Sequence, residues 1–106
     1  MSRSRRREVF HDFAERAEEE IGDSLRKIIL YGSVAREEDT RDSDIDVFAI
    51  VEAEEDLERL RHMAFDFGVL ENGVSISVQG EIEEDFEGFS SNSFLRNIER
   101  DGVEYA

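Results

Sequence analysis

The chain has 106 residues, enough for one small domain with a hydrophobic core but not for two, so we expect a single domain over residues 1–106. Its 28 acidic and 13 basic residues give a net charge of -15, which disfavours general nucleic-acid binding because phosphates are repelled. The chain lacks cysteine, and we find no apolar stretch that would span a bilayer or act as a signal peptide, so we expect a cytoplasmic protein without a disulfide framework.

The acidic excess has a further feature, since lysine occurs only once, at Lys27. Such a composition resembles proteins of salt-loving archaea, whose surface charges are screened because the Debye length falls to about 3 Å at 1 M salt. We therefore expect a halophilic archaeal origin and a surface covered with solvated carboxylates. A functional carboxylate must then be recognised by its position.

The first half of the chain predicts a helix and two strands. Apolar residues at three- and four-residue spacings predict a helix over about residues 5–21. The β-rich apolar run LRKIILY predicts a buried strand over residues 25–31, and a polar connection follows over residues 32–43. DIDVFAIV predicts the second strand, with Ile45 and every second residue after it on one face and Phe48 and Ile50 on the other.

The second half of the chain also predicts both helices and a strand. A second helix is predicted over about residues 54–70, and the alternating stretch VSISVQ predicts a strand over residues 74–79. A short acidic helix, a loop and a terminal helix over about residues 93–100 follow. This order predicts a small α/β (α+β) domain whose helices flank a sheet.

Two carboxylates stand two positions apart at the start of the second predicted strand. Asp44 and Asp46 would point to the same side, roughly 6 to 7 Å apart, and repel each other by about 3 kcal/mol at an effective dielectric near 20. Mg²⁺ relieves such repulsion, because it prefers hard oxygen ligands and takes phosphate oxygens as further partners. The pair therefore predicts a metal site that faces a nucleotide phosphate.

Gly32 and Ser33 follow the first predicted strand directly. Glycine lets the backbone approach a ligand closely, and Ser33 offers a hydroxyl and an N–H at the start of a possible short helix whose amides attract phosphate. Arg36 adds a bidentate donor for phosphate. The plainer interpretations are that Ser33 caps a helix and that Arg36 forms surface ion pairs.

Gly-Ser, ten residues and then Asp-x-Asp, within YGSVAREEDTRDSDIDVFAIV, resemble the motif of the DNA polymerase β-like nucleotidyltransferase superfamily. More narrowly, the chain resembles the minimal nucleotidyltransferases, from Ile28 to the ending FLRNIERDGVEY. The resemblance implies a short mixed β-sheet flanked by helices. It also implies that Asp44 and Asp46 are catalytic residues and ligands in a two-metal Mg²⁺ site, and that Gly32 and Ser33 cradle the triphosphate of ATP, with Arg36 nearby.

Many minimal nucleotidyltransferases resemble antitoxins that are encoded beside a HEPN-like toxin, usually an RNase. The resemblance implies transfer of AMP from ATP to such a protein partner. Two alternatives are a catalytically weak or inactive module that neutralises the toxin by contact alone and, less favoured, an enzyme that modifies a small molecule. Relatives of that last kind resemble longer chains with a second substrate-binding domain.

The chain departs from the family pattern at two points, and the first, a missing third carboxylate, favours the contact-only alternative. Active members carry a third carboxylate on the next strand, where VSISVQ offers Ser75 and Ser77, while Glu71 and Glu81 lie outside the predicted strand. Glu37 stands where the family commonly has glycine.

The remaining polar residues carry plainer expectations. Asp39 and Asp42 are predicted to be solvated loop residues. His11 and His62 are predicted to be surface or half-buried residues on helices, without a partner at metal-ligand spacing. The arginines of RSRRR, residues 3–7, are expected to form a frayed terminus that pairs with the acidic surface.

Overall fold

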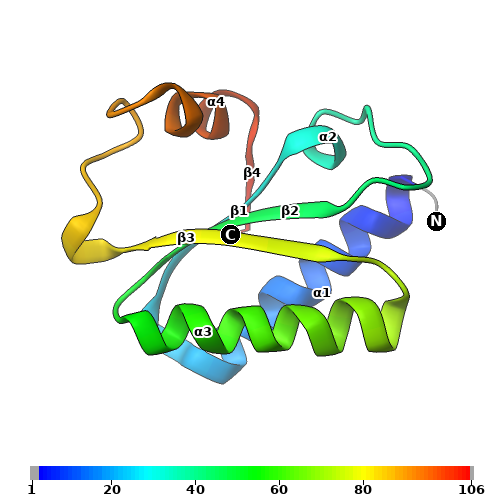
Figure 1. Cartoon of the computed structure of the whole chain (residues 1–106), viewed down its shortest axis with the longest axis horizontal. Coiled ribbons are helices and arrows are strands. Elements are labelled where there is room, and N and C mark those ends of the chain that lie inside the picture. Colours follow the sequence, from blue (N-terminus) through cyan, green and yellow to red (C-terminus); the bar gives the residue numbers. More distant parts are fainter. Residues whose placement is uncertain (1–2, 106) are drawn as a thin grey trace.

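The computed structural model describes residues 3–105, which form a four-stranded sheet with helices on both faces (Figure 1). In chain order the elements are α1 (Arg3–Ile21), the 3₁₀ turn η1 (Gly22–Ser24), β1 (Leu25–Tyr31), α2 (Gly32–Ala35), β2 (Ile45–Val51), α3 (Glu54–Met63), the π-helix η2 (Ala64–Asn72), β3 (Ile76–Ile82), the 3₁₀ turn η3 (Glu83–Asp85), α4 (Ser93–Asp101) and β4 (Val103–Glu104). Within the described part of the chain, every helix is too short or too polar to cross a bilayer.

The sheet is mixed, with the strand order β3-β2-β1-β4. β1 runs antiparallel to both β2 and β4, whereas β2 and β3 are parallel and are connected through α3 and η2. A parallel pair needs such a crossover, because its strands cannot be joined by a tight turn. The predicted mixed sheet flanked by helices is confirmed.

Two apolar layers cover the two faces of the sheet. Val47 and Ala49 of β2 face the larger core beneath α1, α3 and η2. On the opposite face Phe48 packs with Leu95 and Ile98 of α4. Figure 1 shows α1 and α3 on one side of the sheet and α4 on the other. The predicted division of β2 into two faces is confirmed, and its burial on both sides explains why the strand is almost wholly apolar.

The second predicted helix and the third predicted strand differ in their ends. The helix is α-helical only as far as Met63 and continues as the π-helix η2. Gly68 lies against the start of the next strand, since a Cβ there would stand 2.7 Å from the Val74 carbonyl oxygen. β3 begins two residues later than predicted and continues to Ile82, so Glu81 lies inside the strand, not outside it.

Candidate functional site

Gly32 lies directly against the side chain of Asp46. The register pairs Tyr31, the last residue of β1, with Asp46, the second residue of β2, so the turn after β1 begins beside this carboxylate. Gly32 has a φ of +75°, and a Cβ at this position would collide with the Asp46 carboxylate. Both the left-handed backbone and the close approach require glycine here. The structure therefore places the Gly-Ser bend at Asp46.

Asp44 and Asp46 differ in their surroundings. Asp44 precedes β2 and is exposed, whereas Asp46 lies within the strand and is half-buried. Burial raises the pKa of the Asp46 carboxyl, the negative charge of Asp44 raises this pKa further, and the positive charge of Arg36 lowers it. The two carboxylates thus repel each other, and a cation between them would relieve both the desolvation and the repulsion.

Tyr31 lies with Gly32, Asp44 and Asp46 in one group, the Gly32–Asp46 cluster. Sequence reasoning missed Tyr31. Burial raises the pKa of its phenol, and the charge of Asp46 adds to this effect, so the hydroxyl is protonated at neutral pH. The signal in the sequence is its position, because the residue that immediately precedes the Gly-Ser pair must lie beside Asp46 once β1 and β2 are paired.

Ser33 lies in the first turn of the one-turn helix α2, and Arg36 follows its last residue. The helix begins at Gly32 and its N-cap position falls on Tyr31, so Ser33 does not cap it. Among the described residues, no partner accepts a hydrogen bond from the Ser33 hydroxyl. Arg36 is exposed, and its Nε lies 3.2 Å from the Glu38 carboxylate, as the surface interpretation predicts. Its charge nevertheless also acts on Asp46, so it lies near the site.

Glu37 has a left-handed backbone, with a φ of +60°. A non-glycine residue is strained in this conformation, which glycine adopts without that strain. The exposed Glu37 carboxylate lies 3.7 Å from Nη2 of Arg7 on α1. The turn after α2 thus accommodates a glutamate at position 37.

Arg6 holds the loop between α2 and β2 from the inside. Its side chain is 2% exposed, and Nη1 lies 3.3 Å from the Asp39 carboxylate, which is fully buried. Nε and Nη2 donate hydrogen bonds to the carbonyl oxygens of Ser43 and Arg41, at 3.1 and 2.5 Å. These contacts fix the backbone immediately before Asp44.

Two sequence predictions are therefore wrong. Asp39 is not a solvated loop residue, and Arg6 is not part of a frayed terminus that pairs with the surface. The neighbouring Arg5 and Arg7 do pair with surface acids, Glu8 and Glu37, as expected for that segment. A run of charged residues carries no signal that one of them is buried, because the partner lies 33 residues away in the chain.

The β3 position beside Asp46 carries no carboxylate. The parallel register pairs Asp46 with Ser77 and Ile50 with Glu81. Glu81 shares the face of Asp46 but lies four residues further along, roughly 13 Å away at the rise of a strand. Glu71 lies on η2 and pairs with Arg16 at 3.2 Å. Within the described residues, neither glutamate is placed to serve as the third acid.

Two hollows adjoin the site. One, of about 200 Å³, lies between the end of β1, α2 and α4, and is lined by Tyr31, Gly32, Arg36, Phe94, Asn97, Ile98 and Asp101. The other, of about 270 Å³, lies on the side of the loop before β2, and is lined by Arg6, Arg41, Asp42, Ser43, Asp44, Gly73, Val74 and Ser75. The first contains two aromatic rings, and the second contains none.

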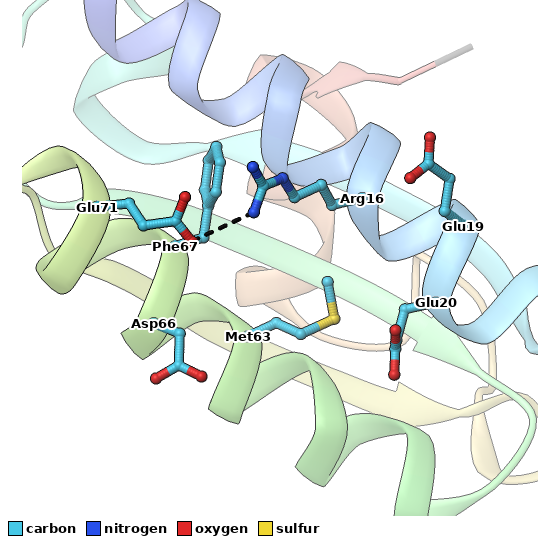
Figure 2. A pocket seen from close by; sticks show the side chains of 7 residues that line it. All are labelled: Arg16, Glu19, Glu20, Met63, Asp66, Phe67 and Glu71. Carbon is cyan, nitrogen blue, oxygen red and sulfur yellow. Dashed lines mark hydrogen bonds and ion pairs between the residues drawn. The ribbon is translucent and has the colours of Figure 1, made fainter.

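A larger groove, of about 580 Å³, lies between α1 and the α3–η2 helix (Figure 2). Arg16 spans it, with its guanidinium 4.5 Å from the centre of the Phe67 ring and 3.2 Å from the Glu71 carboxylate. Three further acidic side chains, Glu19, Glu20 and Asp66, and Met63 line the remainder. No residue of the Gly32–Asp46 cluster lines this groove, so its size does not make it the active site.

One acidic cluster stands apart on α1. Ligand atoms of His11, Asp12 and Glu15 lie within 4.8 Å of one another, and all three residues are exposed. The expectation that His11 lacks a partner at ligand spacing is therefore wrong, although exposed acids often gather in this way without a metal. His62 is exposed, in agreement with its prediction.

Comparison with known proteins relates the chain to a family. The model of the nucleotidyltransferase domain family matches residues 11–103. No curated protein matches the chain significantly by sequence.

Several solved structures share the fold. A toxin–antitoxin protein crystallised with AMP-PNP is 15% identical with a TM-score of 0.59, over 91% of this chain and 72% of that one. A Sulfolobus solfataricus protein proposed to be a nucleotidyltransferase is 16% identical with a TM-score of 0.56, over 96% and 80%. A variant of the toxin–antitoxin MntA–HpeT is 13% identical with a TM-score of 0.58, over 91% and 72%. At these identities the likeness shows the fold alone.

Proposed function

Since this chain belongs to the nucleotidyltransferase domain family, we propose that it binds ATP with Mg²⁺ at the Gly32–Asp46 cluster and transfers AMP to a partner protein. The observation that carries the proposal is the contact between Gly32 and the Asp46 carboxylate. It joins the two halves of the motif, which are separated by ten residues in the sequence, into one site.

A divalent cation fits the donors at this place. Asp44 and Asp46 offer hard carboxylate oxygens, and the repulsion that raises the pKa of Asp46 is the electrostatic penalty that a cation removes. Asp44 and Asp46 would hold the metal, which would also take phosphate oxygens of the nucleotide as ligands. When bound, Mg²⁺ neutralises charge on the transferred phosphoryl group.

The residues of the chain itself supply the rest of the site. Gly32 leaves the backbone accessible to a phosphate, and the Ser33 hydroxyl is available as a donor. Arg36 contributes positive charge beside Asp46. Tyr31 retains its proton and can donate a hydrogen bond, and its ring forms one wall of the adjoining hollow. Together these groups bind and orient a triphosphate with its α-phosphate near the carboxylates.

We further propose that the partner is a HEPN-like toxin and that this chain is its antitoxin. Two of the solved structures with the same fold are toxin–antitoxin proteins, one of them with AMP-PNP.

The alternative is a module that neutralises its partner by contact alone. Ser77 favours it, because this residue occupies the β3 position beside Asp46 where a third carboxylate would act as a base and metal ligand. Nucleotide would still bind to such a protein, but AMP transfer would be weak or absent.

Incubation with α-labelled ATP, Mg²⁺ and the product of the neighbouring gene, in high salt, separates the two. Label on the partner that is lost with Asp46→Asn and retained with Asp66→Asn, an exposed aspartate on η2, supports the transferase. Neutralisation of the partner without label supports the contact-only module. If neither ATP nor the neighbouring product binds, both functions are excluded.

A further inference from the structure

We infer that the hollow between the end of β1 and α4 holds the nucleobase of the bound nucleotide, with Phe94 stacked on the base and Asn97 reading the edge of an adenine. This rests on the proposed function, since it extends the site that holds the phosphates. Gly32 and Arg36 line the hollow, so it opens directly from the Gly-Ser bend. At about 200 Å³ it is smaller than the roughly 300–1,000 Å³ typical of pockets that enclose a whole ligand, and it suits a base alone.

Aromatic side chains give the hollow its stacking surface. The rings of Tyr31 and Phe94 are perpendicular, with centroids 5.6 Å apart, so Tyr31 presents its ring at right angles to Phe94 and supports it. Phe94 is 46% exposed although it stands at the start of an amphipathic helix whose Leu95 and Ile98 are buried. An exposed phenylalanine beside a phosphate site offers a π face to a base, and such stacking tolerates any base.

Asn97 supplies the selectivity that stacking lacks. It lies one turn after Phe94 on α4, is exposed, and its carboxamide makes no hydrogen bond with another described residue. A carboxamide offers one donor and one acceptor side by side, which pairs with the N7 acceptor and N6 donor of adenine. Guanine presents two acceptors, N7 and O6, so the oxygen of the Asn97 carboxamide would face O6 of guanine and the two acceptors would repel each other.

The linings of the two hollows set the direction in which the nucleotide lies. Asp101 also lines the hollow beside α4, where its carboxylate accepts hydrogen bonds from Arg100 at 3.1 and 3.2 Å, so its charge is compensated. The hollow on the other side of Asp44 contains Asp42 and no aromatic ring, so it offers no surface for a base. The base therefore lies toward α4 and the phosphates lie along Gly32.

Titration calorimetry of the whole chain with Mg²⁺, using ATP, GTP and inorganic tripolyphosphate as probes, tests this arrangement. Phe94→Leu keeps apolar packing but removes the π face, and is expected to weaken ATP binding about tenfold while tripolyphosphate binding is unchanged. Phe65→Leu is the matched control, because Phe65 is 56% exposed on η2, away from the site. Asn97→Ala is expected to abolish the preference of the wild type for ATP over GTP.

The outcomes separate this inference from the function it extends. If Asp46→Asn weakens binding of ATP and of tripolyphosphate while Phe94→Leu leaves both unchanged, the hollow is not the base site and the phosphate site stands. A preference for GTP in the wild type, or an ATP preference that persists in Asn97→Ala, overturns the role of Asn97. If the wild type binds neither ATP nor tripolyphosphate, the proposed function and the inference fall together.

Discussion

Replacement of Asp39 by asparagine tests how the loop before Asp44 is held. The change removes the negative charge 3.3 Å from the guanidinium of Arg6, which is 2% exposed. Breaking a buried ion pair from one side destabilises a protein by about 3–5 kcal/mol. In a domain of this size 1 kcal/mol corresponds to a shift of about 4–8 °C in Tm, so the variant should melt at least about 12 °C below the wild type.

The double variant Arg6→Met/Asp39→Asn sharpens the test. It removes the guanidinium together with the Asp39 charge but leaves the partly buried carbonyl oxygens of Arg41 and Ser43 without this donor, at about 1–3 kcal/mol for each acceptor. We expect it to be destabilised by less than the sum of the two single variants, since each single change also strands a charge. Circular dichroism melts in high salt measure this, with Arg5→Met as a control at an exposed pair. An Asp39→Asn variant within about 0.5 kcal/mol of the wild type would refute the reasoning.

Three further predictions follow from the site and the charge. Because folding raises the pKa of Asp46, its ionised form destabilises the fold, and this penalty disappears as the pH falls below the unfolded pKa of about 3.9. Asp46→Asn should therefore raise the Tm by a few degrees at pH 7 without divalent ions, and by less near pH 4. A lower Tm of this variant at pH 7 would contradict the reasoning. Gly32→Ala should lower the Tm of the protein more than Gly22→Ala and should weaken triphosphate binding. Both glycines have a positive φ, but only at position 32 would a Cβ stand against Asp46, so equal losses of Tm would contradict the close contact. Raising salt from 0.1 to 1 M shortens the Debye length from about 10 to 3 Å and should raise the Tm of this chain of charge -15, whereas a Tm that falls with salt would exclude adaptation of the surface to salt.

The elements with strong hydrophobic periodicity could be predicted from sequence. α1 is marked by apolar residues at helical spacing, and β1 by an unbroken apolar run whose predicted bounds agree with the structure. The phase of β2 follows from the same logic, because one register alone buries Val47 and Ala49 beneath the helices. This phase also placed Asp46 on the face of Phe48, and hence beside Gly32.

What escaped prediction depends on contacts between distant segments. The burial of Arg6 requires the loop at Asp39, and β4 has only two residues, too few to show an alternation. The end of β3 was missed because QGEI shows no apolar alternation, although these residues pair with β2 over their full length. The hollow beside Phe94 exists only because α4 returns to pack on β1. Such features belong to the tertiary structure and leave no local pattern.

Binding of ATP by calorimetry, with and without Mg²⁺, tests the central claim most directly. The wild type should bind ATP only when the divalent ion is present, and the double variant Asp44→Asn/Asp46→Asn should lose this binding while it remains folded. Binding that does not depend on the metal, or that survives in the double variant, would contradict the assignment of these two carboxylates as the metal-holding centre of the site.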